Sequence, residues 1–368
     1  MKIVFSSNVS WSVYNFRRGL LSSLQEDGHD IYTVASEDGY SDKLKDLGFN
    51  YYKVNINNNS KNPLQDLKTL YQYYKIYKQI KPDVICHNAI KPNIYGTLAA
   101  KILGIRVINN ISGLGTLFIR QSFSTKIAKI LYKISQNKAS RVFFQNNDDL
   151  NLFLKNGLVK EEITKVIPGS GVNTNKFIPN KKKERKGIFI FLFVGRLIYD
   201  KGIRELIEAC KILKRRYSNF KVMLLGPIYK SNETAINYYE LKLWIEQGLV
   251  EYIGESDNVI SEMQKADCLV LPSYREGLSK VLIEASSVGL PIITTNTPGC
   301  KDVVIDHKTG YLVEVKNEKD LFLKMEKMLL LSEKQRDNMG AEARKRAIAV
   351  FDEKIIIQHY KDEIYSLF

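Results

Sequence analysis

The sequence predicts an α/β protein with two tandem, doubly wound domains, and three observations support this fold class. At 368 residues the chain has the length of two domains of about 150–200 residues each. Short apolar runs rich in β-branched residues alternate with segments of helical spacing, which is typical of parallel sheets covered by helices on both faces. The stretch Pro168–Lys186 is rich in Gly, Pro, Asn and charge and lacks apolar periodicity, so it divides the pattern into two halves.

The first half begins with a β-rich run, Lys2–Ser7, and a segment of helical spacing, Trp11–Glu26. Further strands are expected at Ile31–Ala35, Asp83–Cys86, Arg106–Asn110, Val142–Gln145 and Lys165–Ile167, and further helices at Ser41–Leu47, Leu64–Lys81, Pro92–Leu103 and Ser124–Asn137. His87 follows one of these strands and is interpreted as a polar residue at a strand end.

The strand pattern restarts after the divide, at Ile188–Val194. Further strands are expected at Phe220–Leu225, Val250–Ile253, Cys268–Leu271, Pro291–Thr295 and Tyr311–Val315, and helices at Arg204–Arg216, Tyr238–Gln247, Val259–Lys265 and from Lys319 onward. In doubly wound sheets a ligand binds outside the carboxyl ends of the strands, where loops lead into helices. The loops that follow the strands are therefore the places to search for a site.

Composition and charge restrict the class of protein. The longest apolar run, Ile188–Val194, is far shorter than the roughly 20 residues that span a bilayer, and no signal peptide is read at the start, so a cytoplasmic protein is expected. Four cysteines without a C-x-x-C pair are interpreted as reduced thiols. The net charge is +15, and residues 1–180 hold 24 Lys and Arg against 13 Asp and Glu. This basic half suits nucleic acid, anionic lipid or a phosphorylated substrate.

Several common signatures are absent from the sequence. There is no G-x-x-x-x-G-K-[ST] loop, and neither Gly113-x-Gly115 nor Gly169-x-Gly171 has the third glycine of a dinucleotide fingerprint. No D-x-D pair occurs, and the four histidines lack the spacing of metal ligands. Neither a catalytic metal nor another cofactor is expected. Nucleic acid is not expected as a partner, because no recognition motif accompanies the charge.

The stretch Leu271–Pro291, LPSYREGLSKVLIEASSVGLP, has the order strand, glycine-bearing loop and helix. The free N–H groups and the dipole of a helix N-terminus favour an anion in front of it. Glu276 in the loop and Glu284 on the helix are eight residues apart and can face one ligand from different heights.

Two other strand ends carry candidate ligand groups. Arg196 and Lys201 follow the first strand of the second half, and their side chains suit phosphate oxygens, although two solvated basic residues in a turn are an alternative. Gly226 ends the next strand, where a missing side chain admits a ligand or makes a plain turn.

Together these segments, in the order GRL…DKG, LLG, LPSYREGLSKVLIEA and GLPIITTNTPG, resemble glycosyltransferase family 4. The resemblance covers about 100 residues of the second half. It implies a retaining enzyme with two Rossmann-like domains facing across a cleft (GT-B). The first half matches more loosely, through Lys2–Arg18, His87–Ile105 and Ser112–Gly115. There the chain is similar to bacterial N-acetylhexosaminyltransferases that build lipid-linked surface glycans.

The resemblance also implies roles for matching residues. Arg196 and Lys201 would bind the diphosphate of the donor, Glu284 the ribose and Glu276 the donor sugar, so that Glu276, Arg196 and Lys201 form the catalytic set. The backbone around Gly226, Gly277, Leu278, Ser279, Lys280 and Val281 would complete the donor site. Where many members have a catalytic His this chain has Ser112, which with Gly113 could shape the sugar pocket.

The expected organisation is an acceptor domain at residues 1–170, a linker at 171–186, a donor domain at 187–350, and a final helix at 351–368 that crosses back to the first domain. Lys68–Lys81 and Thr125–Lys138 mix Lys with Tyr, Leu and Ile at helical spacing. Such helices suit an anionic membrane surface, although a core face with a solvated basic face is an alternative. A peripheral location on the inner face of the cell membrane is therefore expected.

We therefore expect a retaining glycosyltransferase that moves a sugar, by resemblance an N-acetylhexosamine, from a UDP-sugar to a polyprenyl-diphosphate-linked glycan. GDP remains open as the nucleotide, and the sequence does not name the linkage or the acceptor. Two alternatives stay open: a nucleotide-sugar epimerase on the same fold, and a non-catalytic two-domain binding protein.

Overall fold

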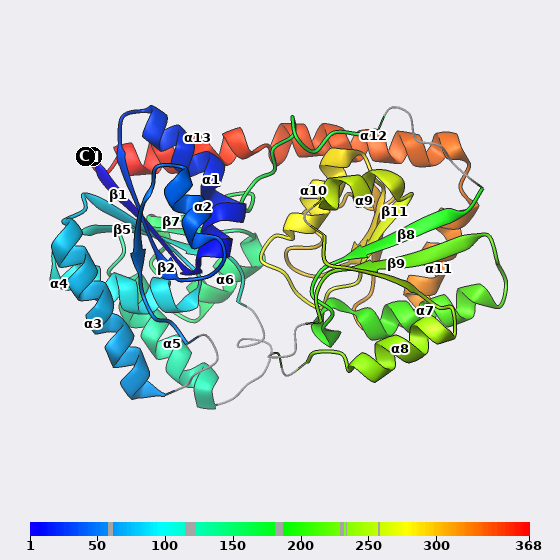
Figure 1. The fold of residues 1–368 in the computed structure, drawn as a ribbon, viewed down its shortest axis with the longest axis horizontal. Coiled ribbons are helices and arrows are strands. Elements are labelled where there is room, and N and C mark those ends of the chain that lie inside the picture. The colour runs from blue at the N-terminus through cyan, green and yellow to red at the C-terminus, as the bar shows by residue number, and fades with distance from the viewer. Residues whose placement is uncertain (58–61, 115–122, 181–186, 229–231, 233, 257) are drawn as a thin grey trace. The chain divides into compact units, whose positions relative to one another are not determined.

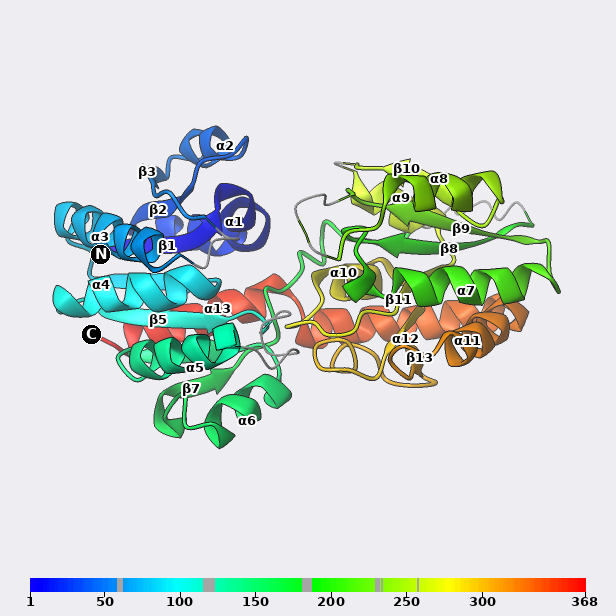
Figure 2. The same ribbon diagram turned by 90° about the horizontal axis from the view of Figure 1, so that it is seen from below.

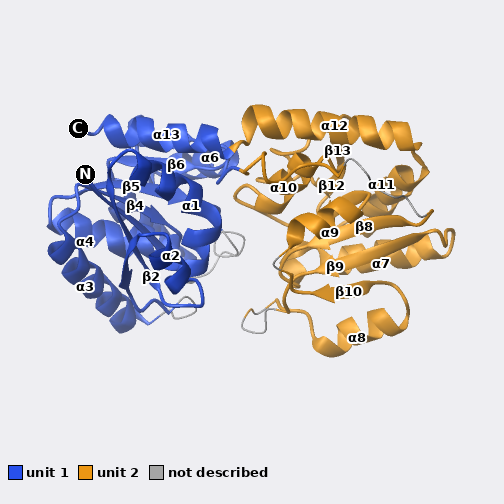
Figure 3. Cartoon of the chain, turned by 45° about the horizontal axis from the view of Figure 1, so that its top comes forward, with its two compact units in different colours: residues 1–171, 353–368 blue, residues 172–352 orange. Residues whose placement is uncertain are grey.

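The structure of the protein is a computed structural model that describes the whole chain except residues 58–61, 115–122, 181–186, 229–231, 233 and 257 (Figure 1 and Figure 2). The chain divides into two compact units (Figure 3). Unit 1 comprises residues 1–171 and 353–368, and unit 2 comprises residues 172–352. Within the described part of the chain, no helix is both long enough and apolar enough to cross a membrane.

Unit 1 contains a seven-stranded parallel sheet in the order β3-β2-β1-β4-β5-β6-β7. Its strands are β1 (Lys2–Val9), β2 (Asp30–Ser36), β3 (Asn50–Lys53), β4 (Val84–Asn88), β5 (Arg106–Ile111), β6 (Arg141–Phe144) and β7 (Thr164–Val166). Its helices are α1 (Ser10–Glu26), α2 (Ser41–Asp46), α3 (Pro63–Ile80), the π-helix η1 (Pro92–Gly96), α4 (Thr97–Ile102), α5 (Phe123–Gln136), α6 (Asn147–Lys155), the 3-10 turn η3 (Glu161–Ile163) and α13 (Glu353–Tyr365).

Alternating side chains of the strands supply both faces of the unit 1 core. Val4 and Ile85 lie in a cluster with residues of α3, α4 and α5, whereas Phe5 and Ile108 lie in a cluster with residues of α1 and α13. Figure 1 shows α1 and α13 side by side on this second face. On α13 the buried residues recur every four positions, and Tyr360 packs its ring 4.9 Å from that of Phe143, measured between centroids.

Unit 2 contains a six-stranded parallel sheet in the order β10-β9-β8-β11-β12-β13. Its strands are β8 (Phe189–Val194), β9 (Phe220–Leu225), β10 (Glu251–Gly254), β11 (Cys268–Leu271), β12 (Ile292–Thr295) and β13 (Gly310–Val313). Its helices are the 3-10 turn η4 (Tyr199–Lys201), α7 (Ile203–Lys214), α8 (Tyr238–Glu246), α9 (Val259–Lys265), α10 (Lys280–Val288), α11 (Glu318–Leu330) and α12 (Glu333–Val350). Helix α7 packs beside α11, and α10 packs beside α9 and α12.

The predicted fold class, two α/β domains with parallel sheets, is confirmed. Three elements of unit 1, β3, α6 and the 3-10 turn η3, were not among the predicted ones. The helix expected over Pro92–Leu103 begins as a π-helix and continues as α4. Of the segment interpreted as a linker, Val172 is buried in the core of unit 2 and its N–H donates to Phe351 O at 2.8 Å, while residues 181–186 lie outside the described residues.

His87 is near the end of a strand, as interpreted, although the strand extends beyond its predicted end at Cys86 and includes it. It lies inside β4 and is 1% exposed. One ring nitrogen lies 2.9 Å from the Tyr77 hydroxyl and the other lies 3.0 Å from Asn109 Oδ1. Burial lowers the pKa of His87 to about 4, so the ring is neutral at pH 7 and serves as a hydrogen-bonding core residue.

Candidate active site

The candidate donor site of unit 2 is built on the ends of two adjacent strands. Strand β8 lies beside β11, and the strand order runs outward in opposite directions from these two. In an open α/β sheet this topological switch point is where ligands bind, because the loops on either side leave a crevice. The loop Gly195–Lys201 follows β8 and the loop Pro272–Ser279 follows β11, so the predicted basic and acidic residues share one edge of the sheet.

Lys201 and Glu276 form an ion pair between these two loops, from Lys201 Nζ to Glu276 Oε1. Their side chains are 18% and 15% exposed, so both charges are largely shielded from water. A partly buried pair interacts more strongly than one on the surface. The structure thus brings together two of the three predicted catalytic residues, which are 75 positions apart in the sequence.

Backbone contacts hold the loop after β8 against the loop after β11. The Tyr274 N–H donates to Asp200 O at 2.9 Å, and the Ser273 hydroxyl donates to the same oxygen at 3.3 Å. Gly202 has a φ of 74°, and a Cβ at this position would overlap the carbonyl of Pro272. Only glycine therefore allows this approach without displacement, which explains the glycine after Lys201.

A third loop, after β12, supports Glu276 from the other side. The Glu276 N–H donates to Pro298 O, and the Ser279 N–H donates to Gly299 O, both at 3.0 Å. The Gly299 N–H in turn donates to Asp302 Oδ2 at 2.7 Å. Sequence reasoning included the Pro-Gly dipeptide of this loop but missed Asp302, for which the only signal was an acidic residue shortly after that turn.

The loop after β11 leads into the N-terminus of α10. Ser279 is the N-cap residue, its side chain makes no capping hydrogen bond, and the first turn contains no acidic residue. The helix dipole is therefore not neutralised by a local carboxylate and favours an anion at this end. The predicted backbone segment, Gly277–Val281, lies here; Gly277 and Ser279 are buried, while Leu278, Lys280 and Val281 are half-buried.

Glu284 lies in the second turn of α10 with its side chain 14% exposed. Burial raises the pKa of this carboxyl above its ordinary value, and the positive charge of Lys280, whose Nζ is 3.8 Å away, opposes that shift. A shielded carboxylate near a helix N-terminus can accept hydrogen bonds from the hydroxyl groups of a sugar, which suits the predicted ribose contact.

The remaining predicted residues lie near these loops or in the other unit. Arg196 is exposed at the end of β8. Gly226 follows β9, and its N–H donates to Gly254 O at 2.8 Å; a Cβ there would overlap the carbonyl of Gly195. Ser112 and Gly113 belong to unit 1, where they follow β5, and Ser112 is exposed.

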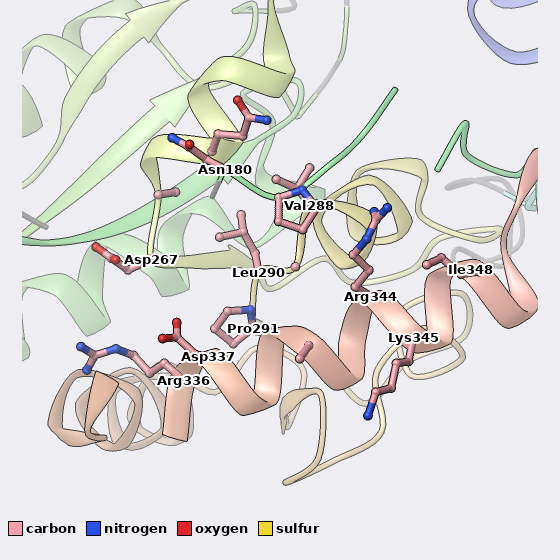
Figure 4. A pocket seen from close by; sticks show the side chains of 15 residues that line it. Asn180, Asp267, Val288, Leu290, Pro291, Arg336, Asp337, Arg344, Lys345 and Ile348 are labelled. Atoms are coloured by element: carbon pink, nitrogen blue, oxygen red, sulfur yellow. The ribbon is translucent and has the colours of Figure 1, made fainter. Parts of the chain in front are cut away.

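A pocket of about 500 Å³ lies elsewhere in unit 2 (Figure 4). Its lining includes Asp267 and Pro291, which precede β11 and β12, so it lies at the amino ends of the strands. Figure 4 shows Arg344 reaching into it from α12. The Arg344 guanidinium donates to Phe177 O at 2.8 Å and to Thr174 O at 3.0 Å, which gives it a structural role. This pocket is separate from the predicted site residues.

Comparisons with known proteins agree with this architecture. The family model "Glycosyl transferases group 1" matches residues 174–346, and "Glycosyl transferase 4-like" matches residues 2–146. The chain is 30% identical, over 98% of its length and 97% of the relative's, to the N,N'-diacetylbacillosaminyl-diphospho-undecaprenol alpha-1,3-N-acetylgalactosaminyltransferase of Campylobacter jejuni.

A second relative and a solved structure extend this similarity. The chain is 26% identical, over 82% of its length and 80% of the relative's, to the UDP-Gal:alpha-D-GlcNAc-diphosphoundecaprenol alpha-1,3-galactosyltransferase of Escherichia coli. The solved structure of Anabaena Alr3699/HepE in complex with UDP has a TM-score of 0.79 at 18% identity, and the match covers 100% of both chains. At this identity the structural likeness establishes the GT-B fold alone.

Proposed function

Because the chain belongs to the glycosyltransferases with a group 1 second domain and a 4-like first domain, we propose that it transfers an N-acetylhexosamine from a UDP-sugar, with retention of anomeric configuration, to a polyprenyl-diphosphate-linked glycan. The observation that carries the proposal is the shielded Lys201–Glu276 pair, which joins the loops after β8 and β11, the second of which leads into α10. Two relatives named for glycosyl transfer to diphospho-undecaprenol acceptors support the acceptor class. The name of one of them supports UDP as the nucleotide.

In this proposal unit 2 stabilises the leaving group. The bond between the anomeric carbon and the donor phosphate breaks, and the acceptor hydroxyl oxygen bonds to that carbon. The departing phosphate oxygen takes the hydroxyl proton. Negative charge grows on the diphosphate, so Arg196, Lys201 and the α10 dipole lower the barrier because they are fixed in place before the reaction.

The two acids have different proposed roles. Glu284 accepts hydrogen bonds from the ribose and fixes the nucleotide. Glu276 contacts the donor sugar and, without donor, serves as the counter-ion of Lys201. Donor binding then exchanges one negative partner of Lys201 for another, so the lysine keeps a compensating charge in both states.

The reaction is tested with radiolabelled UDP-N-acetylglucosamine and UDP-N-acetylgalactosamine and with a polyprenyl diphosphate that carries one sugar. We expect label to enter a lipid-extractable product. Failure to transfer from every UDP- and GDP-sugar to every such acceptor would falsify the proposal. An epimerase would instead change the donor without an acceptor, and a binding protein would leave both compounds unchanged.

We further propose that unit 1 contacts the anionic inner surface of the cell membrane. On α5 the side chains of Ile127, Ile130 and Ile134 are 44%, 59% and 45% exposed, and the exposed Lys126 and Lys133 flank them. Helix α3, which contributes to the same core cluster, exposes Leu64, Leu67 and Tyr71. Exposed apolar side chains with flanking lysines are typical of helices that lie on anionic lipid.

Vesicle sedimentation tests this contact. We expect the protein to sediment with vesicles of phosphatidylglycerol and phosphatidylcholine, and the double variant Lys126→Glu/Lys133→Glu to remain in the supernatant. The matched control Lys242→Glu/Lys265→Glu makes the same change of charge on α8 and α9 and should sediment as the wild type does. Equal sedimentation of both double variants would contradict the proposed surface.

A further inference from the structure

The carboxyl edge of the unit 1 sheet carries polar side chains that lack hydrogen-bond partners. Ser7 Oγ, Asn88 Oδ1 and both amide atoms of Asn110 are buried and unpaired. Ser7 is 2% exposed and Asn110 is 0% exposed. Buried polar groups in folded proteins are almost always paired with protein or with an ordered molecule. We call these three residues the polar row.

Strand register aligns the polar row across three neighbouring strands. Asn88 lies opposite Asn110, and Ser7 directly follows Ser6, the last residue of β1 that pairs with β4, opposite His87. Neighbouring strands are about 4.8 Å apart, so the row extends about 10 Å across the sheet. Because side chains alternate between faces, the row shares the face that α1 and α13 cover.

The polar row lies at the topological switch point of unit 1. The strand order reverses between β1 and β4, which end at Val9 and Asn88. Helix α1 begins directly after β1, and the Trp11 N–H in its first turn donates to Asp38 Oδ2 at 2.9 Å, so a carboxylate already compensates this helix end. This edge therefore has the topology of a ligand site, in addition to its unpaired groups.

A buried positive charge lies on the same face of the sheet. Arg17 of α1 is 4% exposed, and its guanidinium donates one hydrogen bond, to Phe16 O at 3.4 Å. Among the described residues Arg17 forms no ion pair; its guanidinium lies 5.2 Å from the centroid of the Tyr360 ring. The Tyr360 hydroxyl lies near Asn110. A shielded cation without an acid attracts an anion.

We propose that the polar row and Arg17 form the subsite for the glycosyl diphosphate end of the acceptor. Amide and hydroxyl groups both donate and accept hydrogen bonds, so the row matches the hydroxyl and acetamido groups of a sugar ring. Arg17 supplies the charge that attracts the attached diphosphate. This inference rests on the proposed function, because it assigns the place where the lipid-linked acceptor of that reaction binds.

The variants Ser7→Ala and Asn110→Leu test the row. Each removes an unpaired polar group, so we expect the thermal unfolding midpoint to stay the same or to rise. The probe is a short-chain polyprenyl diphosphate carrying one N-acetylglucosamine, dispersed in detergent. We expect the KM for this acceptor to rise at least about tenfold, which corresponds to the loss of one or two hydrogen bonds, while the KM for the donor changes less than about twofold.

Thr33→Val is the matched control for the row. Thr33 Oγ1 is also buried and unpaired in unit 1, but it lies opposite Phe5 on β2, away from the row. This variant should leave both KM values unchanged. An unchanged acceptor KM in Ser7→Ala and Asn110→Leu would overturn the inference. So would a lower unfolding midpoint with both KM values raised together, since the groups would then be structural and satisfied by water.

Arg17→Gln and Arg17→Lys test the charge with two acceptors, the diphosphate above and an uncharged alkyl glycoside of the same sugar. The wild type should favour the diphosphate, Arg17→Lys should keep that preference, and Arg17→Gln should lose it. An unchanged preference in Arg17→Gln would overturn the role of Arg17. If the wild type glycosylates neither acceptor, the proposed function itself fails; if it glycosylates both while all variants behave as the wild type, only this inference fails.

Discussion

The switch points of the two units have the same topology but opposite chemistry. In unit 2 the edge at β8 and β11 carries charged side chains that already form a pair, Lys201 with Glu276. In unit 1 the edge at β1 and β4 carries neutral polar groups without partners, Ser7 and Asn88 among them. The comparison teaches that the doubly wound sheet supplies a place for a ligand, whereas the side chains at the strand ends decide which ligand it takes.

The difference has a physical reason in the two proposed ligands. The leaving group of a nucleotide-sugar departs as an anion, so the donor site needs fixed positive charge. When the donor is absent, pairing with an acid lowers the free-energy cost of burying the lysine charge. A sugar acceptor is recognised by its hydroxyl groups, for which amides and hydroxyls are suitable partners. Three predictions test this contrast.

The largest effect is expected for Lys201→Ala. Loss of the cation that faces the leaving diphosphate should lower kcat by about 100- to 1000-fold, because this interaction is strongest in the transition state. Steady-state kinetics with saturating donor measures it. Lys211→Ala, which removes an exposed lysine of α7 paired with Glu208, is the control and should retain its rate. A kcat for Lys201→Ala within twofold of the wild type would contradict the proposed role of Lys201 in stabilising the leaving group.

A smaller effect on activity and a clear effect on stability are expected for Gly202→Ala. The new methyl group would overlap the Pro272 carbonyl and separate the loops after β8 and β11. The control is Gly187→Ala, which has the same φ of 74° but meets no described atom within 4 Å. Both variants share the strain of a left-handed backbone, so the overlap alone should lower the free energy of unfolding by about 1–3 kcal/mol more in Gly202→Ala. Denaturant unfolding measures the difference, and equal losses would mean that the loops adapt freely.

The smallest effect is expected for Glu284→Gln. Loss of a charged acceptor for the ribose should raise the KM for the donor about tenfold with little change in kcat. Because burial raises the pKa of Glu284 in the folded state, the folded protein holds this proton more tightly than the unfolded chain does. The stabilisation that comes from the bound proton is present at low pH and is lost as pH rises through the folded pKa.

The unfolding midpoint of Glu284→Gln should therefore exceed that of the wild type at pH 7, and the two should converge near pH 4, below the ordinary pKa of a Glu carboxyl. Thermal unfolding across this pH range measures the sign of the difference between the two midpoints. A variant that is less stable than the wild type at pH 7 would mean that the carboxylate is stabilised by the fold, contrary to its burial.

The sequence by itself determined the fold class and the loops that carry the candidate donor site. Alternation of apolar runs and helical spacing predicted most elements, because side-chain periodicity is a local property that the chain carries before it folds. The glycine after β8 and the two acids around α10 could be assigned from the sequence because their positions relative to a strand and a helix are also local properties. The short strand Asn50–Lys53 and the helix Asn147–Lys155 were missed, since few residues in them form a periodic pattern.

Only the tertiary structure decided which of these groups meet. Lys201 contacts Glu276 because the parallel strands β8 and β11 are neighbours in the sheet, although the strands β9 and β10 and the helices α7, α8 and α9 lie between β8 and β11 in the sequence. The Glu276 N–H meets Pro298 O only once β12 lies beside β11. His87 is neutral because the assembled unit buries it beside Tyr77 and Asn109. The polar row likewise exists only because three strands lie side by side with these residues near their carboxyl ends, since hydrogen-bond satisfaction is a property of the assembled sheet and of no single segment.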